Sequence, residues 1–297
     1  MIDVRFILGA WMVFWKMEIK LFIKRKKKMT YLTRSNFQDH PFHLVSPSPW
    51  PLYTSVALFS LTLSTALSLH SFDNSYIFFY TALISLIASM TLWFRDIIAE
   101  GTFLGNHTLA VQKGLNLGVI LFIVSEALFF LAIFWAFFHS ALTPTIELGA
   151  QWPPIGIEPI NPFELPLLNT VILLSSGATV TYAHHALIKG ERKGALYGSI
   201  ITVLLAVIFT LFQGVEYNVS SFTISDGAFG TCFYFGTGFH GFHVIIGTIF
   251  LAVGLWRIFA YHLTDNHHLG FESGILYWHF VDVVWLFLYA SIYYWGS

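Results

Sequence analysis

Seven long apolar stretches divide the sequence and constrain its fold more than any other feature. They run approximately over residues 52–70, 76–94, 115–141, 165–186, 195–215, 228–256 and 275–295. Each is close to the ~20 residues that an α-helix needs to cross the hydrocarbon core of a bilayer. Because lipid cannot satisfy exposed backbone polar groups, stretches of this kind cross it as helices. The sequence therefore predicts an all-α, polytopic integral membrane protein with seven transmembrane helices.

The composition agrees with this class and excludes others. Of the 297 residues, 56% are hydrophobic and only 10% are charged, whereas a soluble domain carries about 25% charged residues. The formal net charge of −1 argues against a nucleic-acid partner. The single cysteine, Cys232, excludes an intramolecular disulfide and any site that needs paired thiolates within the chain. An iron–sulfur cluster or a thiolate-bridged copper centre held by this chain alone is thereby excluded.

The positions of the basic residues predict the orientation of the chain. After the N-terminal segment, which is basic through Arg34, lysine and arginine fall only in connections on the side of the N-terminus: Arg95, Lys113, Lys189, Arg192, Lys193 and Arg257. The connections on the opposite side contain acidic residues but no basic ones. By the positive-inside rule, the N-terminus faces the cytoplasm or matrix and the C-terminus faces outward.

Residues 1–28 differ from the rest of the chain. Their apolar part is too short to span a membrane, and their charges follow it rather than precede it, so no cleavable targeting signal is predicted. We interpret them as a basic extension ahead of a natural start at Met29; a basic arm on anionic lipid is the alternative. Residues 29–297 are predicted to form a single seven-helix membrane domain.

Glu126 is an acidic residue near the middle of the third apolar stretch. A charged side chain at that depth costs several kcal/mol on the mildest insertion scales, so it must be neutral, hydrated, or met by a group from another helix or a lipid. One alternative is a membrane transporter or proton relay that uses Glu126. Broken helices or a second acid on the same pathway would favour that alternative, and neither is evident in the sequence.

Other polar residues within the spans have structural interpretations. His279 and Asp282 share a helix face, which predicts a hydrogen bond between them. His240 and His243 also share a face, but the paired spacing of haem ligands on two helices is absent, so we expect these histidines to be hydrogen-bonded. Ser225 or Asp226 is expected to cap the sixth span. Small residues in the fourth span, Ser175–Thr181, and glycines in the sixth are expected to form packing surfaces.

Two groups of polar residues lie at the N-terminal-side ends of the spans, and we call them the first and second ledges. The first ledge comprises Arg95, Asp96, Glu100, His107 and Lys113. The second comprises Arg257, His262, His267, His268 and Glu272. At headgroup depth such groups suit phospholipid phosphates, although ordinary anchoring of helix ends remains an equal alternative. On the same side, His40 and His43 are candidates for collecting protons, since histidine titrates near neutrality.

Several ordered motifs resemble one known family. They are Trp93-Phe-Arg-Asp96, Ala110-Val-Gln-Lys-Gly114, Phe122-Ile-Val-Ser-Glu-Ala-Leu-Phe-Phe130, Trp135-Ala-Phe-Phe-His139, Glu164-Leu-Pro-Leu-Leu-Asn-Thr170, Phe222-Thr-Ile-Ser-Asp-Gly227 and Trp278-His-Phe-Val-Asp-Val-Val-Trp-Leu-Phe-Leu-Tyr289. From Met29 to Ser297 the chain resembles cytochrome c oxidase subunit 3 of mitochondria, in a fungal-like form. Phe94 and Gln151 depart from it, standing where many relatives have tryptophan and cysteine.

The resemblance implies a non-redox core subunit of respiratory complex IV, in the mitochondrial inner membrane, with its N-terminus in the matrix and its C-terminus in the intermembrane space. Its partners would be the catalytic subunit 1, subunit 2 and small accessory subunits, and haem and copper would lie in those partners. Two N-terminal helices would splay from a five-helix bundle and form a cleft for structural phospholipids. By position, the implied lipid-binding residues are Glu126, His107, Arg257, His267, Trp93 and Glu100.

Overall fold

The computed structural model describes residues 40–297, apart from the side chain of Leu148. The predicted extension over residues 1–28 and the predicted start at Met29 lie outside the described residues. Seven helices in the described part are long and apolar enough to cross a membrane. They are α2 (Trp50–Leu69), α3 (Ser75–Thr102), α4 (Leu109–Leu142), α5 (Leu165–Lys189), α6 (Arg192–Val219), α7 (Gly227–Phe259) and α8 (Leu269–Leu288). The predicted seven-helix, all-α fold is confirmed.

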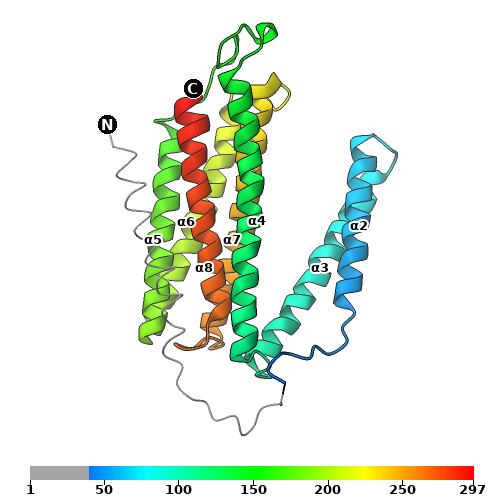
Figure 1. Cartoon of the computed structure of the whole chain (residues 1–297), viewed down its shortest axis with the longest axis vertical. Helices are drawn as coiled ribbons and strands as arrows, with labels where there is room; N and C mark the ends of the chain where they lie inside the picture. Colours follow the sequence, from blue (N-terminus) through cyan, green and yellow to red (C-terminus); the bar gives the residue numbers. More distant parts are fainter. Residues whose placement is uncertain (1–39) are drawn as a thin grey trace. The chain divides into compact units, whose positions relative to one another are not determined.

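The helix ends differ from the predicted spans. Helix α3 continues to Thr102, and α4 extends over 34 residues, because a polar residue beyond the apolar stretch can still continue the helix into the headgroup region. A short 3₁₀-helix, η3 (Ile146–Leu148), lies between α4 and α5, and α8 continues as the π-helix η4 (Tyr289–Trp295). In Figure 1 the C-terminus, the α4–α5 connection and the α6–α7 connection lie at one end of the five-helix bundle. This is the end without basic residues.

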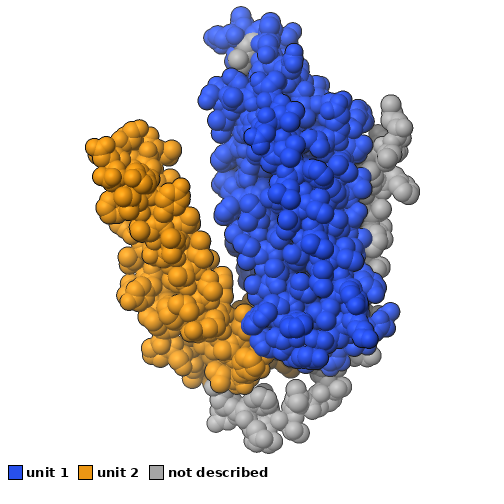
Figure 2. All heavy atoms as spheres, turned by 180° about the vertical axis from the view of Figure 1, so that it is seen from behind, with its two compact units in different colours: residues 1–33, 116–297 blue, residues 34–115 orange. Residues whose placement is uncertain are grey.

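The described chain divides into two compact units, which Figure 2 colours separately. One unit ends at Leu115 and contains α2 and α3; the other runs from Asn116 to Ser297 and contains most of α4 together with α5–α8. This division agrees with the predicted grouping of two N-terminal helices and five others.

In the smaller unit, α2 and α3 form a hairpin held by small residues and a few polar bonds. Its buried residues include Ala57, Ala82 and Ser89. The Thr54 hydroxyl donates to Ser89 Oγ over 3.2 Å. At the end that carries the first ledge, the indole Nε1–H of Trp50 donates to Asp96 Oδ2 over 2.5 Å. This bond fixes Asp96 on the N-terminal side of the hairpin.

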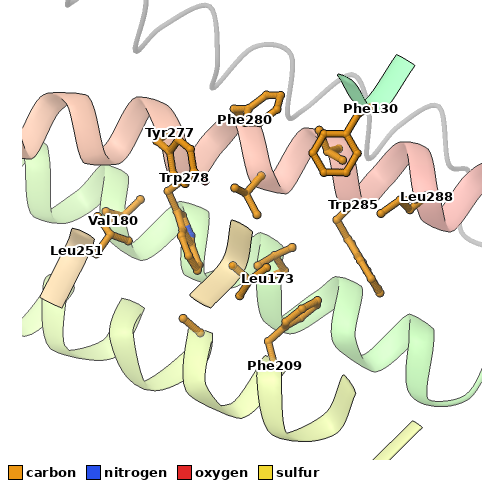
Figure 3. Packing of buried hydrophobic residues seen from close by; sticks show 14 of the residues in the cluster. Phe130, Leu173, Val180, Phe209, Leu251, Tyr277, Trp278, Phe280, Trp285 and Leu288 are labelled. Atoms are coloured by element: carbon orange, nitrogen blue, oxygen red, sulfur yellow. The ribbon is translucent and has the colours of Figure 1, made fainter. Parts of the chain in front are cut away.

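The core of the larger unit is built around α8. Trp278 and Trp285 are fully buried and point from α8 into the apolar cluster shown in Figure 3. The indole of Trp278 donates to Ser176 Oγ, and the indole of Trp285 donates to Thr170 Oγ1, both over 2.9 Å. Both hydroxyl groups belong to α5, so small polar residues on that helix form a packing surface, as predicted.

Close packing of α5 against α6 makes Gly198 a sensitive position. A Cβ atom there would lie 2.9 Å from Ala183 Cβ and 3.0 Å from the carbonyl oxygen of Thr179. Small residues at such crossings let two helix backbones approach. We expect Gly198→Ala to destabilise the chain by about 1–3 kcal/mol through overpacking, measured as a lower denaturant midpoint.

Gly214, also on α6, provides the matched control. No described atom lies within 4 Å of a Cβ built there, so Gly214→Ala is expected to be neutral or slightly stabilising, since alanine is the better helix former. Equal effects of the two substitutions would contradict the packing assigned to Gly198.

The predicted side-chain cap of the sixth span is wrong. Asp226 is the N-cap residue of α7, but its side chain makes no cap hydrogen bond. Its Oδ2 instead accepts from the backbone N–H and the hydroxyl of Thr223, over 2.6 and 3.1 Å. The carboxylate is therefore turned back to the preceding loop, where it closes the turn that enters the helix.

Candidate functional site

Glu126 has a partner from another helix. Its Oε2 lies 2.8 Å from His243 Nε2, which joins α4 to α7. The His243 side chain is only 5% exposed and that of Glu126 is 23% exposed. The acid predicted to need a partner, a proton or water within the membrane is thus met by an imidazole.

The second nitrogen of His243 fixes the proton content of this pair. His243 Nδ1 lies 2.8 Å from the carbonyl oxygen of Phe239. A carbonyl oxygen only accepts hydrogen bonds, so Nδ1 carries a hydrogen. The contact between Nε2 and Glu126 then requires one further proton, shared between the carboxyl group and the imidazole. Whichever atom holds that proton, the pair as a whole is neutral.

Aromatic rings surround the imidazole. The ring centroids of Phe239, Phe130 and Tyr277 lie 4.6, 5.2 and 6.1 Å from that of His243. They keep the imidazole end of the pair dry, while the carboxyl end retains some exposure. A neutral acid–imidazole pair with one accessible side is better suited to a polar contact with lipid than an isolated, ionised carboxylate would be.

The second ledge is a three-dimensional cluster that includes a residue from α5. Glu272 Oε1 lies 3.1 Å from His268 Nε2 and 3.6 Å from His184 Nε2. His268 Nδ1 donates to the carbonyl oxygen of Thr264 over 2.7 Å, which directs Nε2 toward the glutamate. The three donor atoms lie within 4.8 Å of one another and could hold a metal ion, since two imidazoles and a carboxylate are a donor set that Zn²⁺ uses.

Arg257 gives this ledge its positive charge, and His267 lies within reach of that charge. The Arg257 guanidinium lies against Gly270, because a Cβ atom built at that glycine would be 2.7 Å from Nη1. Partial burial lowers the pKa of His267 from its ordinary value, and the charges of Arg257 and His268 lower it further. At neutral pH the ledge therefore presents a permanent cation beside a neutral imidazole.

The first ledge is assembled within the smaller unit. Arg95 and Asp96 form an ion pair with an N–O distance of 2.8 Å. His43 Nδ1 lies 4.0 Å from Glu100 Oε2, and the rings of His43 and His107 are 5.9 Å apart. The donor atoms of these last three residues also lie close enough to hold a metal ion.

The remaining residues predicted on this side lie apart from that cluster. Trp93 is half-buried, and Lys113 is exposed. His40 is exposed, and its Nδ1 contacts only the backbone of Phe42 among the bonds described for it. Of the two histidines predicted to collect protons, His43 thus belongs to the ledge and His40 faces outward.

The predicted hydrogen bond between His279 and Asp282 is wrong. His279 Nδ1 and Asp282 Oδ2 are 3.6 Å apart, and neither oxygen of the fully buried Asp282 has a hydrogen-bond partner among the described residues. His279 Nε2 instead contacts Thr181 Oγ1 of α5 over 3.2 Å. The imidazole therefore contacts α5 through Nε2, while Nδ1 stays near Asp282 one turn along its own helix.

A second buried glutamate lies at the opposite end of the bundle. Glu216 is only 2% exposed. Its Oε1 accepts from the Tyr293 hydroxyl over 2.5 Å and from Gln213 Nε2 over 3.1 Å. Asn169 Nδ2 extends this network to Gln213 Oε1 over 3.5 Å. Sequence reasoning does not reveal this buried glutamate, because the tyrosine that covers it is 77 residues away.

Seven membrane-crossing helices, a neutral glutamate–histidine pair within them and two basic–histidine ledges define a polytopic membrane protein with an intramembrane polar pair. A sequence model described as cytochrome c oxidase subunit III matches residues 40–297. The chain is 86% identical over 269 residues to cytochrome c oxidase subunit 3 of Podospora anserina, covering 91% of this chain and all of that protein. It is 84% identical to the Neurospora crassa protein of the same name over the same shares, and 73% identical to that of Emericella nidulans over 90% and 100%. The chain belongs to the cytochrome c oxidase subunit III family.

Membership confirms the predicted function as a core subunit of respiratory complex IV and places the chain with other oxidase subunits in the mitochondrial inner membrane. The subunit is part of the oxidase without being its redox component. Helix α4 runs unbroken through Glu126, so the broken helix that would favour the transporter alternative is not observed at this residue.

Proposed function

We propose that this subunit binds structural phospholipids and thereby stabilises the proton-pumping catalytic subunit while electrons pass from cytochrome c to oxygen. Its direct partners would be subunit 1, subunit 2 and small accessory subunits, and these would contain the haem and copper. The lipid contacts would come from His107, Glu100 and Trp93 of the first ledge region, from Arg257 and His267 of the second, and from Glu126.

The second ledge is the observation that carries this proposal. A phospholipid phosphate is recognised by a permanent cation together with hydrogen-bond donors at headgroup depth. Arg257 supplies the cation. His267, whose pKa is lowered, supplies a neutral N–H donor, so no second ion has to be desolvated when the phosphate binds. Arg257 lies in the last turn of α7, and His267 lies at the end of the connection that leads into α8, on the side predicted to face the matrix.

Glu126 would contribute differently. Because its pair with His243 is neutral as a whole, it can lie beside acyl chains and glycerol esters without the cost of a buried ion. The 23% exposure of its side chain leaves room for such a contact. Its role would be to hold lipid and helices together rather than to move protons through the membrane.

The distribution of basic residues supports an N-terminus in the matrix and a C-terminus in the intermembrane space. In this orientation His40 and His43 would lie on the side of proton uptake. Replacing both with glutamine should lower turnover at alkaline pH if they collect protons, and unchanged turnover there would remove this role. Met29 as the mature start remains a proposal, which the intact mass of the purified subunit would decide.

Phospholipid retained by the purified oxidase tests the main proposal. We expect Arg257→Gln to weaken headgroup binding by about 1 kcal/mol, roughly fivefold, since one cation near an anionic lipid contributes about that much. The measurement is phospholipid per haem, by mass spectrometry of the extracted complex after a fixed detergent wash. Lys113→Gln is the control, because it removes an exposed cation that is not among the assigned lipid contacts. Equal phospholipid in all three preparations would contradict the proposal.

A further inference from the structure

We propose that a groove between α6 and α7 binds an anionic phospholipid at a site separate from both ledges. Its volume is about 510 Å³, within the range of small-molecule sites. Its walls include Lys193, Tyr197 and Ile200 from α6 and Ala252, Trp256 and Phe259 from α7. None of these residues belongs to either ledge, so the site stands independently of the lipid contacts proposed above.

Helical spacing produces the groove. The lining residues of α6 recur at intervals of three and four, and so do those of α7, so that each helix offers one continuous face. Ala252 is small where its neighbours on the same face are large, and this leaves a hollow rather than a packed seam. The apolar walls below Lys193 suit a hydrocarbon tail.

Charge at the mouth of the groove selects the headgroup. Lys193 lies in the first turn of α6, one residue after Arg192. Arg192 Nη2 donates to the carbonyl oxygen of Phe259 over 2.8 Å, and its guanidinium lies 3.7 Å from the ring centroid of Tyr261. These contacts hold a second cation at the end of α7. With Lys193 in the lining and Arg192 beside it, the mouth is complementary to a negative headgroup.

The aromatic residues fix the depth of the occupant. Tyr197 and Trp256 are 66% and 53% exposed, although both lie in membrane-crossing helices near their basic ends. Tyrosine and tryptophan are enriched at the level of the headgroups, where one side of the ring is apolar and the other is wet. An apolar helix of another subunit would fill the walls but would leave the positive charges of Lys193 and Arg192 without a negative partner. An anionic phospholipid would place its acyl chain against the apolar walls and its negative headgroup beside the cations.

Spin-labelled lipids added to the purified oxidase test this site. Wild-type complex is expected to immobilise spin-labelled phosphatidylglycerol more than spin-labelled phosphatidylcholine. Lys193→Gln should reduce that preference, by up to about fivefold for the affected site. Ala252→Phe should fill the hollow and remove the site for both lipids. Val253→Phe adds the same bulk at an exposed neighbouring position outside the lining and should leave the preference as in the wild type.

Two results would overturn the proposal. One is a phosphatidylglycerol preference that Lys193→Gln leaves unchanged; because Lys193 is exposed, this variant decides the matter even if Ala252→Phe fails to assemble. The other is loss of a neighbouring protein subunit from the purified Ala252→Phe complex but not from Val253→Phe, which would show that a protein helix occupies the groove.

Discussion

His243→Leu is expected to destabilise this subunit by about 2–3 kcal/mol, the cost of leaving an acidic side chain within a span without its partner. The imidazole supplies the hydrogen bond described for the Glu126 side chain, over 2.8 Å, and leucine can neither donate nor accept a hydrogen bond. Thermal release of the subunit from the purified oxidase, followed by gel analysis of the heated complex, measures the effect.

Two further variants distinguish the effect of losing the Glu126–His243 contact from the effect of losing either side chain alone. Glu126→Gln keeps a donor aimed at His243 Nε2 and should cost less than His243→Leu. Combining His243→Leu with Glu126→Leu removes both polar groups and should recover part of the loss, with a coupling energy of about 1–2 kcal/mol, as for other hydrogen bonds between membrane helices. If the destabilisation of the double variant equalled the sum of the two single leucine substitutions, the proposed sharing of a proton between Glu126 and His243 would be contradicted.

Trp278→Ala is expected to have the larger effect, about 3–5 kcal/mol, because it opens a cavity at the centre of the core. Trp278 is fully buried, donates to Ser176 and packs against Gly247, where a Cβ atom would lie 2.9 Å from its ring. The denaturant midpoint of the purified complex reports the loss.

Substitutions at two glycines of α7 provide the control for this packing. Gly247→Ala should press on the indole and destabilise the subunit, whereas Gly241→Ala should not, since no described atom lies within 4 Å of a Cβ built there. A Gly241→Ala variant as unstable as Gly247→Ala would contradict the packing assigned to Gly247, because alanine is the better helix former and helix propensity alone would destabilise neither position.

The features predictable from the sequence are those set by local chemistry. The lengths of the apolar stretches predicted seven helices, and the small residues Ser175–Thr181 of the fourth span predicted a packing surface, to which Ser176 contributes by accepting from Trp278. Each depends on residues that are neighbours in the chain or on one helix face. Such neighbours keep the same geometry in almost any helical protein.

Partners on different helices were not predictable in the same way. Glu126 and His243 are 117 residues apart, and nothing in either span fixes the rotation that brings them together. For His279, the spacing predicted proximity to Asp282 on one helix face, and the two side chains do lie 3.6 Å apart, but the contact of the other ring nitrogen with Thr181 of α5 was not predicted. Contacts between helices are decided by packing, which a single sequence does not specify.

Side-by-side measurement of initial turnover and of active lifetime in the Arg257→Gln oxidase tests the central claim most directly. If this chain binds structural lipid and carries no redox step, the variant should start at the wild-type rate with an unchanged haem spectrum and then lose activity sooner during turnover. Added phospholipid should restore part of that lifetime. A variant whose initial rate falls while its lifetime and bound phospholipid stay at wild-type values would contradict the account.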